Sequence, residues 1–138
     1  MNLDLTSLEN ATAALERSVR AATTFAATLP PELQDTVRSG IIQNFEVAYE
    51  LAWKMMKRWL ELNLGRQTVD GVTRRELFRY AAENRLIDDV ALWMSFHDAR
   101  NETTHTYDHQ TAAGVSATAE TFVASARALL TSLRARNQ

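Results

Sequence analysis

F-E-V-A-Y-E-L-A-W-K-M-M-K, the stretch from Phe45 to Lys57, carries apolar or aromatic residues at nearly every third or fourth position. That spacing places them on one side of an α-helix, where they can pack against other helices. The pattern extends in both directions and predicts one long helix over residues 32–63, stopped by Gly65. One flank of the helix is largely aromatic, which is more typical of core or dimer-interface packing than of a nucleotide-stacking site. Its members are Phe45, Tyr49, Trp53 and Met56.

A second amphipathic helix is expected before this one. Thr6 and Glu9 have the spacing of a capping box, in which the threonine caps the helix and the glutamate lies at its third position. One apolar stripe then continues as far as Leu29. Pro30 and Pro31 end the helix, because the residue before a proline is pushed out of the α region.

A short helix is predicted after a loop over residues 65–71. Thr73 and Glu76 form a second capping box, and the helix that they open ends near Asn84. Its apolar residues are too few for a long stripe, so it is expected to lie between the longer elements.

Two more helices complete the chain. Asp88 or Asp89 caps the first, and Asp108 caps the second, whose apolar stripe runs to Leu133. No strand alternation or internal repeat is present. The predicted fold is therefore all-α, an antiparallel up-and-down four-helix bundle with one additional short helix.

The composition restricts the class of protein. A length of 138 residues predicts a single domain over residues 1–138. The chain has no cysteine, which excludes disulfides, thiolate metal sites and a cysteine nucleophile and suits the cytoplasm. No apolar run approaches the ~20 residues of a membrane span, and the N-terminus lacks the features of a signal peptide, so no membrane partner is expected.

Charge is unevenly distributed along the chain. A net charge of −2 argues against a protein that coats nucleic acid non-specifically. Basic residues nevertheless outnumber acidic ones over residues 54–85, which indicates either a local basic surface or ordinary solvated helix faces. The basic residues there are Lys54, Lys57, Arg58, Arg66, Arg74, Arg75, Arg79 and Arg85.

The most polar stretch, D-A-R-N-E-T-T-H-T-Y-D, runs from Asp98 to Asp108. An arginine fork, an imidazole that titrates near neutral pH and a tyrosine hydroxyl would together suit a phosphodiester substrate. Arg100 and His105 are five residues apart, so on a straight helix they point about 140° from each other. Either the helix bends, tightens or ends here, or two copies of the motif face each other in a symmetric dimer.

Two other interpretations of these residues remain open. His105 and His109 have the spacing of a helical metal-ligand pair, but Asp108 is expected to begin a new helix between them, so no metal site is predicted. In a purely structural role, Arg100 would pair with Glu102 or Asp98, and His105 would be a buried polar residue at a helix junction.

Two segments of the sequence resemble those of known proteins. The segment Arg100–Asp108, R-N-E-T-T-H-T-Y-D, matches the R-x4-H-x-Y form of HepT-like proteins in the HEPN superfamily. The segment Phe45–Lys57 resembles nucleotidyltransferase substrate-binding proteins. The resemblance implies a HEPN-like bundle that acts as a homodimeric, metal-independent endoribonuclease toxin on RNA, without a cofactor. Arg100 and His105 would be catalytic. Asn101 would orient the site, and His97 lies one turn away on the same face.

The same resemblance implies control by a partner. In HepT-type pairs a separate nucleotidyltransferase antitoxin adenylylates the tyrosine that corresponds to Tyr107. Burial of Tyr107 in the core is the structural alternative. The alternative function is that of a non-catalytic substrate-binding subunit of a two-chain nucleotidyltransferase, as the second family name says.

Overall fold

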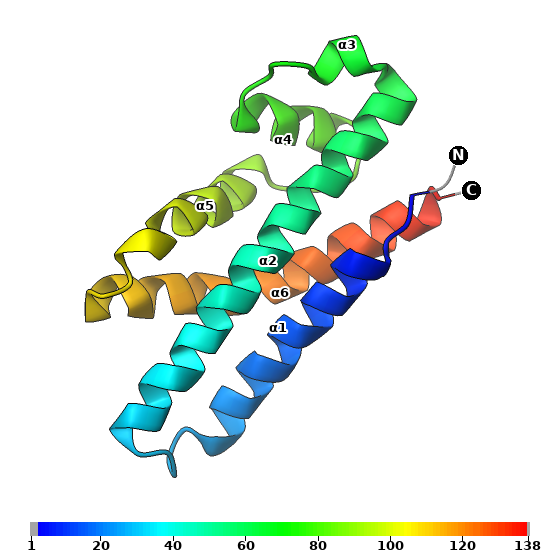
Figure 1. The fold of residues 1–138 in the computed structure, drawn as a ribbon. Coiled ribbons are helices and arrows are strands. Elements are labelled where there is room, and N and C mark those ends of the chain that lie inside the picture. The colour runs from blue at the N-terminus through cyan, green and yellow to red at the C-terminus, as the bar shows by residue number, and fades with distance from the viewer. Residues whose placement is uncertain (1–2, 138) are drawn as a thin grey trace.

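The computed structural model describes residues 3–137 as an all-α bundle (Figure 1). Within this range no strand is present, which confirms the predicted fold class. The elements in chain order are α1 (Thr6–Phe25), α2 (Pro31–Leu64), α3 (Arg66–Val69), α4 (Arg74–Glu83), α5 (Val90–Asn101), the 3-10 helix η1 (Glu102–His105) and α6 (His109–Ala135).

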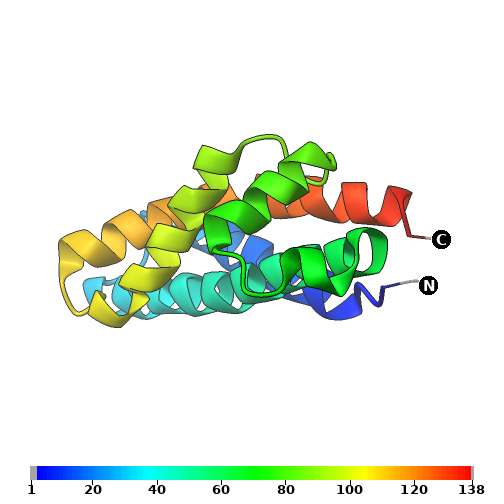
Figure 2. The same cartoon turned by 90° about the horizontal axis from the view of Figure 1, so that it is seen from above.

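The frame of the bundle consists of the three longest helices. α1 and α2 run antiparallel side by side, and α6 crosses both of them (Figure 1). α4 and α5 form a further layer that packs on α2 and α6 (Figure 2). The two ends of the described chain meet, since the Leu3 amide donates to the Asn137 side chain over 2.7 Å. None of the described helices is both long enough and apolar enough to cross a membrane.

The core is centred on Phe122 of α6. Its ring makes edge-to-face contacts with Phe45 of α2, Trp93 of α5 and Phe96 of α5, at centroid distances of 5.4, 5.5 and 5.0 Å. Tyr49 joins the same group at 6.2 Å from Phe122. Most of the aromatic flank predicted from α2 therefore packs in the core, because Phe45, Tyr49 and the neighbouring Met56 are fully buried.

Several predicted boundaries are confirmed. Gly65 ends α2 with a φ of 96°, a backbone conformation that favours glycine. The capping box at Thr73 is complete, and the Asp89 carboxylate accepts from the Leu92 amide at the start of α5. Asp108 caps α6 by accepting from the Gln110 amide.

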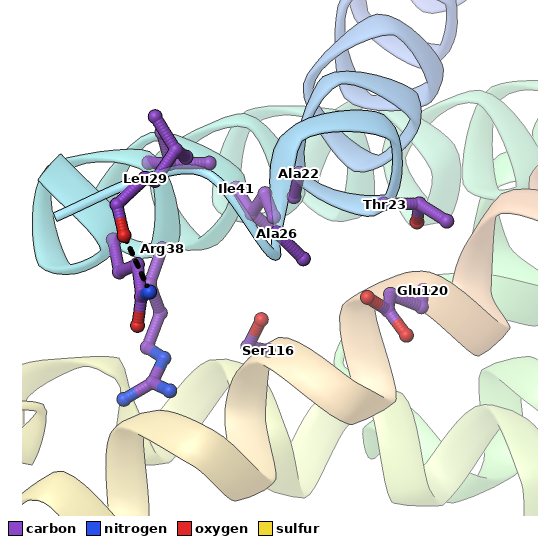
Figure 3. Close-up of a pocket in the computed structure, with 10 residues that line it drawn as sticks. Ala22, Thr23, Ala26, Leu29, Arg38, Ile41, Ser116 and Glu120 are labelled. Atoms are coloured by element: carbon purple, nitrogen blue, oxygen red, sulfur yellow. Dashed lines mark hydrogen bonds between the residues drawn. The ribbon is translucent and has the colours of Figure 1, made fainter. Parts of the chain in front are cut away.

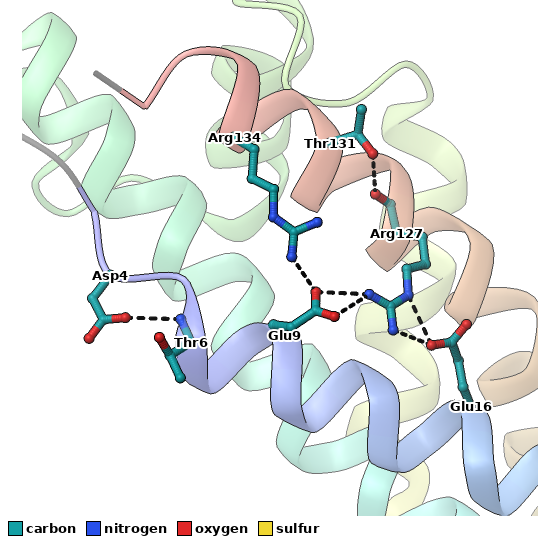
Figure 4. Close-up of polar contacts among 7 residues, drawn as sticks. All are labelled: Asp4, Thr6, Glu9, Glu16, Arg127, Thr131 and Arg134. Carbon is teal, nitrogen blue, oxygen red and sulfur yellow. Dashed lines mark hydrogen bonds and ion pairs between the residues drawn. The ribbon is translucent and has the colours of Figure 1, made fainter.

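The prediction for the start of α1 is wrong. The N-cap residue is Leu5, which has no side-chain capping bond, and the Thr6 amide donates to the Asp4 carboxylate over 3.0 Å. Glu9 turns instead toward Arg127 and Arg134 of α6 (Figure 4). A long-range ion pair thus replaces the expected local cap.

This ion-pair network ties α1 to α6. Arg127 lies between the carboxylates of Glu9, at 2.8 Å, and Glu16, and Arg134 adds a second cation on Glu9 (Figure 4). Arg127 first and Arg134 second lower the pKa of the Glu9 carboxyl below its ordinary value. Because these side chains are 27–52% exposed, solvent screens the network and limits its contribution to stability.

Three element lengths also differ from the prediction. α1 ends at Phe25 rather than at Leu29, and its last turns project beyond the core, with Phe25 55% exposed. The expected loop after Gly65 contains the one-turn helix α3, whose Val69 is buried. α5 has only 12 residues, so the four helices of the bundle are unequal in length.

Candidate functional site

The polar motif lies where α5 ends. α5 stops at Asn101, one residue after Arg100, and the chain tightens into the 3-10 helix η1 before α6 begins at His109. The Thr103 hydroxyl stabilises this change by donating to the Arg100 carbonyl over 2.8 Å and accepting from Arg100 Nη1 over 3.1 Å. The helix therefore tightens between Arg100 and His105, which was one of the two solutions expected from their spacing.

Arg100 points toward α2, where two glutamates face it. Its Nε lies 3.2 Å from Glu50 Oε1 and its Nη1 lies 3.8 Å from Glu46 Oε2. The Nε atom is shielded from solvent but lacks the alignment of a hydrogen bond with Glu50, so this contact is an ion pair. The interpretation in which Arg100 pairs with Glu102 or Asp98 is therefore wrong.

His105 and Tyr107 form a separate, outward-facing pair. Their rings meet edge to face at a centroid distance of 6.3 Å. Tyr107 is 84% exposed, so the alternative of a buried tyrosine is wrong. His105 is also exposed, which overturns the interpretation of this residue as a buried polar group.

Within one chain the motif residues thus fall into two groups. No hydrogen bond or ion pair joins Arg100 to His105 in the described part of the chain. His109 is the first residue of α6 and lies in a different element from His105, so the two do not share a helical face. No cluster of three or more metal-ligating side chains is found among residues 3–137.

His97 lies on the Asn101 side of the motif and is fixed by a buried tyrosine. Its Nδ1 is 3.0 Å from the Tyr49 hydroxyl, and its Nε2 is 3.4 Å from the Asn101 amide group. Tyr49 also accepts a hydrogen bond from Nη1 of Arg74 over 3.2 Å. Burial raises the pKa of Tyr49 to about 12, so its hydroxyl keeps its proton.

The tautomer of His97 follows from these partners. Arg74 is always a donor, so the phenol proton of Tyr49 is left to donate to Nδ1 of His97. The neutral ring then carries its own proton on Nε2. A donor at Nε2 requires the amide oxygen of Asn101 to face it, and a flip of that side chain supplies this oxygen. His97 therefore fixes the orientation of the Asn101 side chain within the motif.

This environment predicts a pH dependence of stability. Burial first, and Arg74 next, lower the pKa of His97 below its ordinary value, while Asp98 and Glu50 oppose and Arg100 adds to the effect. The unfolded chain then binds more protons than the folded chain as the pH falls below about 6.5, and the free energy of unfolding decreases. Urea unfolding at about pH 7.5 and about pH 5.5, both above the range of carboxylate titration, measures this decrease.

The variant His97→Gln isolates this contribution. Its side-chain oxygen can still accept from Tyr49, but it has no proton to gain, so the decrease between the two pH values should become smaller. His109→Gln, which removes an exposed imidazole at the start of α6, is the matched control and should keep the decrease. Equal decreases in wild type and His97→Gln would contradict the assignment.

Sequence reasoning named two of the residues that surround the motif, Tyr49 and Arg74, but connected none of those on α2 and α4 with it. The segment Phe45–Lys57 of α2, from which the fold was predicted, contains Glu46, Tyr49 and Glu50. Arg74 is the first residue of α4. The spacing of Glu46 and Glu50, four apart on one helix face, was the available signal for a cation between them. Nothing local in the sequence connects them to Arg100, which is about 50 residues away.

A separate cavity of about 320 Å³ lies near the loop that joins α1 and α2 (Figure 3). Its floor is apolar, and Arg38 of α2 and Ser116 and Glu120 of α6 border it. It contains no residue of the motif, so it does not enlarge the site around Arg100.

The bundle and its arginine–histidine motif define the class of protein, and comparisons with known proteins agree. Residues 3–135 match the family described as nucleotidyltransferase substrate binding protein like, and the chain belongs to this family. A Haemophilus influenzae protein named "Probable ribonuclease HepT" is 39% identical over 110 residues, which cover 79% of this chain and 75% of that protein.

Two solved structures share the fold. One is a Haemophilus influenzae protein described as revealing the fold of a substrate binding domain of a nucleotidyltransferase, with a TM-score of 0.90 and 34% identity over 95% of this chain and 99% of that one. The other, from Thermus thermophilus, has a TM-score of 0.71 and 25% identity over 92% of this chain and 98% of that one. The expected family is therefore confirmed.

Proposed function

We propose that the chain is a single HEPN-like domain that acts in the cytoplasm as a HepT-like toxin, a homodimeric and metal-independent endoribonuclease. The observation that carries the proposal is the motif itself: a fixed arginine at the end of α5 and an exposed histidine in η1, in a chain 39% identical to a protein named as a probable ribonuclease. These two side chains supply the phosphate ligand and the proton carrier that RNA cleavage requires.

The reaction uses the RNA's own nucleophile. The ribose 2′-hydroxyl attacks the adjacent phosphorus and displaces the 5′-oxygen, which leaves a 2′,3′-cyclic phosphate and a 5′-hydroxyl. His105 takes the 2′-proton or protonates the leaving oxygen, and Arg100 stabilises the charge on the phosphorane-like transition state. Asn101, whose amide oxygen accepts from Nε2 of His97, would orient the phosphate with its amide N–H groups.

A homodimer would complete the site. Arg100 and His105 share no hydrogen bond or ion pair in the described part of one chain, and a two-fold axis through the motif would bring the arginine of each copy toward the histidine of the other. We expect α5, η1 and the loop to α6 at this interface. Light scattering at micromolar concentration should give the mass of two chains, and a monomer would count against it.

The alternative is a non-catalytic subunit that presents a substrate to a separate nucleotidyltransferase. The family description and the description of the Haemophilus influenzae structure favour it, and so does the partial neutralisation of Arg100 by Glu46 and Glu50. Expression of the chain alone in a bacterial host separates the two functions. The toxin should arrest growth and His105→Ala should not, whereas a binding subunit should leave growth unchanged in both cases.

Control by the partner would act at Tyr107. A nucleotidyltransferase antitoxin would transfer AMP from ATP to the tyrosine hydroxyl and release pyrophosphate. The 84% exposure of Tyr107 and its contact with His105 support this, because the added phosphate would lie beside the proton carrier and obstruct RNA.

Tyr107→Phe tests this control. After incubation with the cognate nucleotidyltransferase and ATP, the mass of the wild-type chain should rise in steps of one AMP, while the phenylalanine variant should gain none. Tyr80→Phe, a half-buried tyrosine on α4, is the matched control and should be modified like the wild type. Full modification of Tyr107→Phe would contradict the regulatory proposal.

A further inference from the structure

Arg74, the first residue of α4, is a rigidly held cation next to the motif. Its guanidinium carbon lies 3.6 Å from the centre of the Trp53 ring, and its Nη1 donates to the Tyr49 hydroxyl. Among residues 3–137 no carboxylate lies within ion-pair distance of it. Stacking on tryptophan thus fixes the position of the guanidinium and leaves its other N–H groups for a ligand.

Trp53 and Glu50 connect this cation to the motif. The indole N–H of Trp53 donates to Glu50 over 3.1 Å, and the same carboxylate lies 3.2 Å from Arg100. Glu50 and Trp53 are three residues apart on α2, a rise of about 4.5 Å. The two arginines are therefore held by side chains of the same turn of α2, which Glu50 links by contacting both Trp53 and Arg100.

The charges around this surface nearly balance. Lys54 lies 5.8 Å from the Trp53 ring and adds a second cation on that side, while Asp98 contributes a negative charge near Tyr49 and His97. Glu46 and Glu50 face Arg100 rather than Arg74. Among the described residues neither Arg74 nor Lys54 has an ion-pair partner, so a ligand anion would be drawn by these two cations and not by a broad basic patch.

We propose that Arg74, stacked on Trp53, is a second phosphate-binding position, which holds the RNA phosphate next to the one cut at Arg100 and His105. The inference rests on the proposed ribonuclease function and extends it, since it gives the path of the bound strand over the surface. Single-stranded RNA lies across α2, from the motif toward the start of α4. The stacked guanidinium loses little side-chain freedom when it binds, so the position is pre-organised.

The variant Arg74→Gln tests this position. Glutamine removes the charge but keeps an N–H group for Tyr49, so the His97 contacts can survive. Arg75→Gln is the matched control, because Arg75 is the next residue of α4 and is exposed. Binding is measured in the His105→Ala background, which does not cleave, by the fluorescence anisotropy of a short labelled single-stranded RNA over a range of salt concentrations.

Loss of one phosphate contact has a defined signature. Arg74→Gln should weaken binding about tenfold and make the slope of log K against log salt shallower by about 0.7. Arg75→Gln should change neither quantity. Arg74→Lys should restore the slope but only part of the affinity, because lysine keeps the charge and loses the stacked fork. In the cleavage assay Arg74→Gln should raise KM and leave kcat nearly unchanged.

The outcomes separate this inference from the proposed function. If Arg74→Gln binds RNA with the affinity and salt slope of its parent, or if the parent binds no RNA, the second phosphate position is refuted. If binding depends on Arg74 but the wild type cleaves no RNA, the position stands and the ribonuclease proposal fails. Circular dichroism and the Tm of Arg74→Gln exclude unfolding as the cause of weaker binding.

Discussion

Phe122→Ala should lower the free energy of unfolding by about 3–5 kcal/mol. Phe122 is fully buried and its ring contacts those of Phe45, Trp93 and Phe96, so truncation removes edge-to-face contacts with two helices and leaves a cavity between them. Urea unfolding followed by helical circular dichroism measures the loss as a shift of the midpoint at constant m-value.

Phe25→Ala is the matched control for this change. Phe25 ends α1 and is 55% exposed, so the same truncation should cost less than about 1 kcal/mol. Phe122→Leu should lie between the two, because leucine fills part of the cavity. If Phe122→Ala costs no more than Phe25→Ala, the core is not centred where α2, α5 and α6 meet.

Arg100→Ala and His105→Ala should each nearly abolish RNA cleavage. Removing the proton carrier is expected to slow cleavage by about 10²–10⁴-fold, and removing the charge that stabilises the transition state by about 10²–10³-fold. The two variants should differ in stability. His105 is exposed, whereas loss of Arg100 leaves Glu46 and Glu50 facing each other without a cation.

Two controls make the result specific. His109→Ala removes an exposed imidazole four residues from His105 and should cleave like the wild type. Arg100→Lys keeps the charge but not the planar fork, so it should recover only part of the activity. Initial rates of cleavage of a labelled RNA, together with the Tm of each variant, distinguish lost chemistry from lost folding. Wild-type rates in both alanine variants would refute their catalytic roles.

The sequence predicted the helices whose apolar stripes face the core along their whole length. α6 is the clearest case, since its predicted stripe is buried from Val115 to Leu133. The C-terminal end of α1 was mispredicted because apolar spacing continues to Leu29, although the helix ends at Phe25 and residues 23–28 are exposed. A periodic pattern states which face is apolar, but it does not state where the partner helix ends.

Whether a predicted capping box forms depends on whether its glutamate has an ion-pair partner on another helix. The capping box at Thr73 forms, and among the described residues Glu76 has no ion-pair partner, whereas Glu9 lies within reach of two arginines of α6. An ion pair with Arg127 then outweighs a single cap hydrogen bond. Sequence spacing alone can predict a local capping box, but it cannot predict an ion pair between distant helices.

In the candidate site, too, the local residues could be predicted and their partners from other helices could not. The sequence singled out Arg100, Asn101, His105 and Tyr107, because their chemistry and spacing are local. It left two solutions for that spacing, a distorted helix or a symmetric dimer. The partners that orient the site come from α2 and α4: the carboxylates of Glu46 and Glu50 on Arg100, and Tyr49 with Arg74 behind His97. Only the packing of α5 against α2 brings these groups to the motif.

The ends of the RNA products, formed in excess EDTA, test the central proposal most directly. Mass spectrometry of RNA incubated with the wild-type chain should find fragments that end in a 2′,3′-cyclic phosphate and begin with a 5′-hydroxyl, and His105→Ala should produce none. These ends follow from attack by the 2′-hydroxyl without a metal-activated water. Cleavage that requires a divalent metal, or the same fragments from His105→Ala, would contradict the proposed ribonuclease mechanism.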